Sequence, residues 1–90
     1  MFGKTTHMGR LVELWKSEET ETRVVYSYGP SREQSGSIAC IKSDGAVSLI
    51  EPLPGLSEQE DRFAFRDLAM VKLQMLHRSG DFPDKTYIAT

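Results

Sequence analysis

The chain has 90 residues, of which 39% are hydrophobic, 9% aromatic and 27% charged, and its formal net charge is -2 at pH 7. This length supports one folded domain over residues 1–90, and ordinary apolar and charged fractions exclude disordered, collagen-like and disulfide-rich chains. Because 11 Lys and Arg are outnumbered by 13 Asp and Glu, no cationic excess is present to neutralise a phosphate backbone, which disfavours nucleic-acid binding.

The cysteine and hydropathy patterns bear on the compartment. Cys40 is the only cysteine and cannot form an intramolecular disulfide, whereas secreted domains of this size usually carry several. Residues 1–10 lack the apolar stretch of a signal peptide and are expected to form a loose N-terminus. No apolar run approaches the roughly 18 residues that span a bilayer. We therefore expect a cytoplasmic protein that does not contact a membrane.

Two segments in the first third of the chain are interpreted as strands. Leu11–Lys16 suits a strand buried on both sides, although a short helix fits the same residues. Arg23–Tyr28 is rich in β-branched and aromatic residues, and its period of two places one set of side chains on one face: Val24, Tyr26 and Tyr28. The polar residues Ser17–Thr22 are expected to connect these strands, and Gly29–Gly36 is expected to form a flexible, hydrophilic loop.

A β-hairpin is predicted over Ser37–Glu51. Asp44 and Gly45 stand between two alternating runs, which is typical of a two-residue type I′ turn. This turn predicts three cross-strand pairs on one face of the hairpin: Lys42 with Val47, Cys40 with Leu49, and Ile38 with Glu51.

One long helix is predicted from Ser57 to Arg78. Ser57 and Glu60 have the spacing of a capping box, and Gly80 is a natural left-handed stop. Acidic residues of the first turn are expected to be solvated. The expected sheet-packing face consists of Ala64, Phe65, Leu68, Ala69, Val71, Met75 and Leu76. The fold prediction is an α+β domain: a three- to four-stranded antiparallel meander, this helix on one face, and a short C-terminal edge strand over Thr86–Ala89.

The sequence contains no recognisable catalytic or metal-binding constellation. Cys40 alternates with apolar residues in the hairpin, which indicates a buried thiol rather than a nucleophile paired with His7 or His77. Two histidines and one cysteine at unrelated positions lack the paired spacing of a zinc site. We therefore predict no catalytic residue, no metal and no cofactor, and we lean against an enzyme.

A second apolar strip on the predicted helix suggests a protein interface. Phe63, Met70 and Leu73 lie away from the main apolar face, among Arg66 and His77. If the main face packs on the sheet, this strip is exposed, and exposed apolar surface with a polar rim marks a protein contact. Coverage of the strip within the chain is an equally favoured interpretation. The leading functional hypothesis is a small non-enzymatic interaction protein of the inhibitor, immunity or adaptor kind, which binds another protein or a second copy of itself.

The alternative hypothesis is a nucleic-acid or nucleotide-binding domain. Trp15, Tyr26 and Tyr28 on neighbouring strands could form a stacking platform, with Arg32 of the following loop as a cation. Few basic residues lie among these aromatics, so a core or half-buried stripe is the favoured interpretation of the same pattern.

Overall fold

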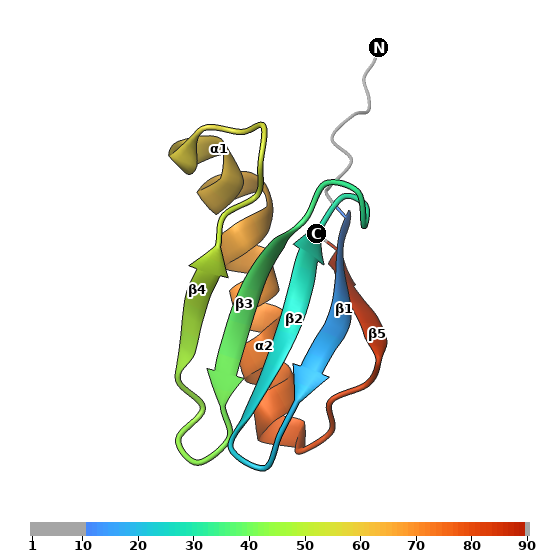
Figure 1. Cartoon of the computed structure of the whole chain (residues 1–90), viewed down its shortest axis with the longest axis vertical. Coiled ribbons are helices and arrows are strands. Elements are labelled where there is room, and N and C mark those ends of the chain that lie inside the picture. Colours follow the sequence, from blue (N-terminus) through green and yellow to red (C-terminus); the bar gives the residue numbers. More distant parts are fainter. Residues whose placement is uncertain (1–10, 90) are drawn as a thin grey trace.

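A computed structural model describes residues 11–89, so the loose N-terminus expected over residues 1–10 lies outside the described residues. The fold is α+β, with an antiparallel meander of four strands, one helix packed on the sheet, and a C-terminal strand beside the first (Figure 1). The strands are β1 (Leu11–Glu19), β2 (Arg23–Gly29), β3 (Gly36–Ile41), β4 (Val47–Glu51) and β5 (Lys85–Ala89). Their order β4-β3-β2-β1-β5 confirms the predicted meander and edge strand.

Strand β1 is longer than the sequence predicts. The polar residues expected to form a connection continue the strand to Glu19, which pairs with Val24 across a bulge between Lys16 and Glu18. The turn into β2 is correspondingly short, and the amide of Thr20 donates to the carbonyl of Arg23 at 2.8 Å. Polar residues remain in this strand because their side chains project to water or form ion pairs.

The β3–β4 hairpin has the predicted strands but a different register. Cys40 lies opposite Val47 instead of Leu49, a shift of two residues. The prediction of a two-residue turn is wrong, because the amide of Ile41 donates to the carbonyl of Ala46 at 2.9 Å and leaves four residues in the loop. A shift of two keeps Ile38 and Cys40 on their predicted face, whereas a shift of one would reverse them. Glu51 is the exception, because a bulge between Ser37 and Ile38 pairs it with Ser37.

Contact with the helix explains the wider loop. The Nε2 atom of His77 lies 2.9 Å from the carbonyl oxygen of Lys42. Gly45 has a φ of +78°, and a Cβ atom there would lie 2.7 Å from Nδ1 of His77. The ring of His77 therefore fastens the hairpin loop to the end of the helix, and only glycine fits both the backbone and the space at position 45.

The helix consists of three consecutive segments: α1 (Glu58–Asp61), the π-helical turn η2 (Arg62–Arg66) and α2 (Asp67–Ser79). It begins at the predicted capping box, in which the amides of Ser57 and Glu60 each donate to the other's side chain at 2.9 and 3.1 Å. It ends at Gly80, whose φ of 78° is left-handed and whose amide donates to the carbonyl of Leu76. No helix within residues 11–89 is long and apolar enough to cross a membrane.

The π-helical turn rotates the start of the helix relative to α2. The amide of Asp67 donates to the carbonyl of Arg62, five residues back, so apolar residues before and after the turn no longer share one face at 100° per residue. Within α2, Leu73 is buried, whereas Val71 and Met75 are exposed, so the predicted sheet-packing face is wrong at Val71 and Met75. Leu73 follows the alternative interpretation, in which the chain itself covers the strip. The buried helix residues are Asp61, Arg66, Ala69, Leu73 and Leu76.

The helix covers one face of the sheet, called here the inner face, and the core lies between them (Figure 1). The inner-face strand residues with no exposed surface are Val12, Leu14, Val24, Tyr26, Tyr28, Ile38 and Cys40. They pack with the apolar side of α2 and with Leu53, which anchors the connection between β4 and α1. Alternation along each strand therefore determines the core, as expected for a sheet with one covered side.

Candidate interaction surface

The opposite face of the sheet, called here the outer face, is covered by no helix of residues 11–89 (Figure 1). Its apolar side chains are Leu11, Trp15, Val25, Ala39, Ile41, Ile50, Tyr87 and Ala89. Trp15, Val25 and Ala39 are buried between their neighbours, whereas Leu11 is 52% and Tyr87 61% exposed. Because β5 adds Tyr87 beside β1, the largest exposed apolar side chains gather at the β1–β5 side of this face.

The outer face is hollowed along the line from β5 to the loop after β2. A hollow of about 410 Å³ is lined by Leu11, Glu13, Lys85, Thr86 and Tyr87. A second, of about 310 Å³, shares Glu13 and Lys85 with the first and adds Trp15 and Arg32. A third, of about 260 Å³, shares Trp15 and Arg32 with the second. The three hollows therefore adjoin and form one shallow groove, called here the outer groove.

Trp15 and Arg32 form the centre of the outer groove. The guanidinium carbon of Arg32 lies 5.5 Å from the centroid of the indole ring of Trp15, within the range of a cation–π contact. The loop that carries Arg32 is held by its own hydrogen bonds, since the amide of Gln34 donates to the hydroxyl of Ser31 and its side chain donates to the carbonyl of Pro54. The structure thus brings together two of the residues that the sequence grouped in an aromatic site.

The other two members of that group lie elsewhere. Tyr26 and Tyr28 have no exposed surface and point to the inner face, whereas Trp15 lies on the outer face. Burial raises the pKa of both tyrosine hydroxyls. The three rings therefore do not form one platform, because the helix covers Tyr26 and Tyr28, as in the favoured interpretation of these residues.

The predicted helix strip is not a continuous exposed surface. Leu73 is part of the core, Met70 is half-buried against it, and Arg66 is 6% exposed. His77 is half-buried and bound to the hairpin loop. Phe63 alone remains strongly exposed, at 63%, and lines a separate hollow of about 590 Å³ beside the start of the helix.

Arg66 belongs to a buried polar cluster that stabilises the start of the helix. Asp61, expected to be solvated, is 0% exposed and accepts hydrogen bonds from the hydroxyl of Tyr28 at 2.9 Å and the amide of Leu53 at 3.2 Å. Arg66 lies 3.9 Å from Asp61 and donates to Glu58. That contact with Glu58 raises the pKa of Arg66 and lowers the pKa of Glu58. The cluster pairs each of its buried charges and is structural.

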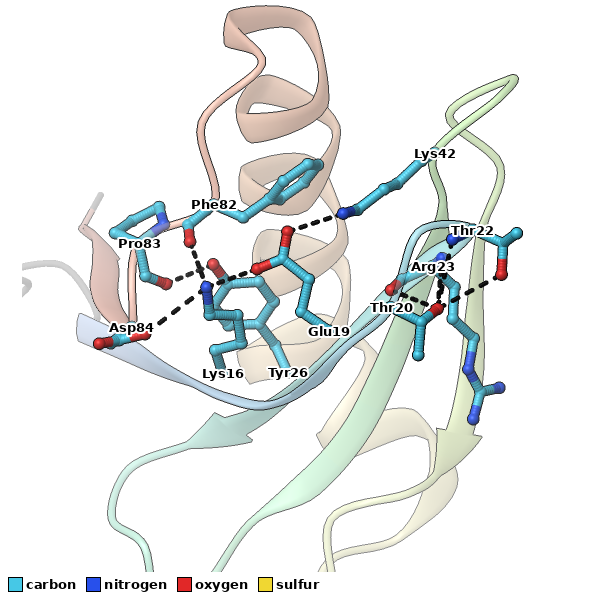
Figure 2. A network of polar contacts seen from close by, with 10 residues as sticks. All are labelled: Lys16, Glu19, Thr20, Thr22, Arg23, Tyr26, Lys42, Phe82, Pro83 and Asp84. Atoms are coloured by element: carbon cyan, nitrogen blue, oxygen red, sulfur yellow. Dashed lines mark hydrogen bonds and ion pairs between the residues drawn. The ribbon is translucent and has the colours of Figure 1, made fainter.

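A second polar cluster ties the C-terminal segment to the sheet (Figure 2). Glu19 accepts hydrogen bonds from Lys16 and Lys42, each at 2.7 Å, and these contacts lower its pKa to about 2. Lys16 also donates to the carbonyl of Phe82 at 2.7 Å. The hydroxyl of Tyr26 donates to the carbonyl of Pro83 at 2.5 Å. These bonds hold the segment before β5 in place and thereby position Tyr87 on the outer face.

The groups with nucleophilic or metal-binding chemistry do not converge. Cys40 is buried in the core, and burial raises the pKa of its thiol, which disfavours the reactive thiolate. Among residues 11–89, no three His, Cys, Asp or Glu side chains are grouped so that they could hold a metal ion.

Two residues of the outer groove were missed by the sequence reasoning. Leu11 and Tyr87 are exposed apolar residues from the two ends of the described chain, brought side by side when β5 pairs with β1. The alternation in the predicted C-terminal strand was the available signal, because it gives Tyr87 and Ile88 opposite faces.

Comparison of the chain with models of protein families, with curated proteins and with solved structures finds no match.

Proposed function

We propose that the protein is a non-enzymatic interaction domain that binds a partner protein on the outer face of its sheet. The observation that carries this proposal is the pair Leu11 and Tyr87, which are more than half exposed beside Trp15 and above adjoining hollows. Tyr and Trp are enriched at protein interfaces and among the residues that dominate their binding energy.

The size of the outer face suits a protein partner. Five strands about 4.8 Å apart, with about 20 Å of length each, give a surface of roughly 24 Å by 20 Å before side-chain relief is counted. Specific interfaces bury about 800 Å² on each partner. The outer face alone covers about 480 Å², so a protein partner would contact the rim of the sheet as well.

The charges of the outer face favour protein over nucleic acid. Lys85 lies 3.7 Å from Glu13, and Arg23 lies 3.3 Å from Glu18, so two of its cations already have acidic partners. A phosphate backbone requires several free cations along one track. A mixed surface with few unpaired charges is typical of a protein interface.

The test measures association by wild-type protein and by a Tyr87→Asp variant. Light scattering at several concentrations gives the solution mass, and affinity capture from the source cell extract followed by mass spectrometry identifies a partner. A purified partner, or a second copy of the chain, should bind wild-type protein and lose at least tenfold in affinity for the variant. A Phe63→Asp variant is the matched control, because Phe63 is equally exposed but lies beside the helix.

The outcomes separate the possibilities. A mass that doubles with concentration in wild-type protein but not in Tyr87→Asp would identify a second copy as the partner. Binding that survives Tyr87→Asp and is lost in Phe63→Asp would place the interface beside the helix and contradict the outer-face proposal. Circular dichroism of both variants checks that the fold is retained.

A further inference from the structure

The two ends of the outer groove differ in chemistry. At the β5 end, Leu11 and Tyr87 supply exposed apolar surface. At the other end, the lining consists of Trp15, Arg32 and the serines Ser17, Ser27 and Ser35, together with Lys16, whose ammonium group points to the inner side and binds Glu19. The groove therefore changes from apolar to cationic and hydroxyl-rich across two strands.

The charge at the second end is unsatisfied within the described residues. No carboxylate of residues 11–89 lies within ion-pair distance of Arg32, whereas Lys85 in the middle of the groove is paired with Glu13. Glu33 lines the middle hollow but not the hollow that holds the three serines. A planar guanidinium held over an indole ring is preorganised to form two parallel hydrogen bonds with a carboxylate.

We propose that the outer groove recognises a partner segment that carries an apolar side chain and an acidic side chain, with the apolar group against Leu11 and Tyr87 and the carboxylate on Arg32. This inference rests on the proposed interaction function and adds the chemistry of the partner. The guanidinium of Arg32 lies over Trp15 of β1, and Trp15 pairs with Lys85, two residues from Tyr87 in the neighbouring strand β5. One strand spacing across the sheet and two residues along it separate the two ends by about 8 Å. In an extended peptide, side chains two positions apart lie on one face about 7 Å apart, so the acidic residue is expected two positions from the apolar one.

The test selects binders from a displayed library of random dodecapeptides on immobilised wild-type protein. Enriched peptides are synthesised and titrated while the fluorescence of Trp15, the only tryptophan of the chain, is recorded. The same peptides are titrated against Tyr87→Ser, Arg32→Gln and Arg78→Gln. Arg78→Gln is the matched control, because it removes the same charge from the end of the helix.

We expect enriched peptides with an acidic residue two positions from an apolar one, and affinity for Arg32→Gln that is about 10- to 100-fold weaker, as for loss of a hydrogen-bonded charge pair. Arg78→Gln should bind like wild-type protein. Peptides that depend on Tyr87 but carry no acidic residue, or that bind Arg32→Gln unchanged, would overturn this inference and leave the interaction function standing. A selection that yields no Tyr87-dependent peptide would overturn the inference, and if Tyr87→Asp also leaves protein association unchanged, the proposed function falls with it.

Discussion

The inner and outer faces of the sheet are built from the same alternating strands but differ in what their large side chains do. On the inner face, Tyr26 and Tyr28 are fully buried and their hydroxyls bond to Pro83 and Asp61. On the outer face, Tyr87 is mostly exposed, and no described residue covers its ring. Similar side chains therefore serve the core on one face and remain available on the other.

This difference separates stability from binding. Removal of an inner-face group costs transfer and cavity free energy, or leaves a buried polar partner without a bond. Removal of an exposed group changes stability little and acts on whatever binds there. The two faces can therefore be distinguished by measurements of unfolding on a short series of variants.

The largest effect is expected at Leu73. Leu73→Asp places a carboxylate in the centre of the core, where its desolvation is uncompensated, and we expect the variant to be unfolded at 25 °C. Leu73→Ala should remain folded and lose about 2–5 kcal/mol in the free energy of unfolding. Far-UV circular dichroism and urea titration measure both variants. A folded Leu73→Asp protein would contradict the buried position of this side chain.

Asp61→Ala is expected to have the next largest effect. It leaves the buried guanidinium of Arg66 without its buried partner and removes the acceptor of the Tyr28 hydroxyl and the Leu53 amide. We expect a loss of about 3–5 kcal/mol in the free energy of unfolding, as for a broken buried pair. Asp67→Ala is the control, because Asp67 is an exposed carboxylate of the same helix outside the cluster, and its loss should cost less than about 1 kcal/mol. Equal losses in both variants would show that Asp61 has no special part in the cluster.

The cluster around Glu19 predicts a dependence of stability on pH. Its carboxyl has a pKa of about 2 in the folded protein against an ordinary value of 4.5, so the folded state favours the charged form. The stabilisation is present above the unfolded pKa and is lost as the pH falls from about 4.5 towards 2. Urea titrations of wild-type protein and Glu19→Gln should therefore differ at pH 6 and converge near pH 2. A difference that is the same at both pH values would contradict this origin of the shifted pKa.

The strands, and the face of the sheet on which most of their side chains lie, were predictable because burial on one side imposes a period of two on each strand. The register of the β3–β4 hairpin was not predictable in the same way. Asp44 and Gly45 favour a two-residue turn locally, but in the folded protein the ring of His77 occupies the space beside Gly45. That contact joins residues more than thirty positions apart. The error of two residues was harmless to the core because Ile38 and Cys40 kept their face.

The helix shows the same limit more sharply. The predicted apolar face combined residues from before and after the π-helical turn, which has no signal in the local sequence. It assigned Leu73 to a second strip, although Leu73 shares the buried side of α2 with Ala69 and Leu76. Asp61 resembles the other acidic residues of the first turn until Tyr28 and Leu53 are placed around it. For the candidate site, Trp15 was identified, but its grouping with Tyr87 depends on β5 pairing with β1, a contact between the two ends of the described chain.

The smallest effect on stability is expected at Tyr87, and it provides the sharpest test of the difference between the faces. Tyr87→Ser removes a ring that is 61% exposed and lies opposite Glu13, so the free energy of unfolding should change by less than about 1 kcal/mol. The same change at Tyr26 removes a buried ring and its bond to Pro83 and should cost about 3–5 kcal/mol. If Tyr87→Ser lowered the free energy of unfolding as much as Tyr26→Ser, the Tyr87 ring would contribute to the packing of the folded protein. A small loss of stability together with a large loss of binding instead means that an exposed tyrosine stands on the outer face for a partner.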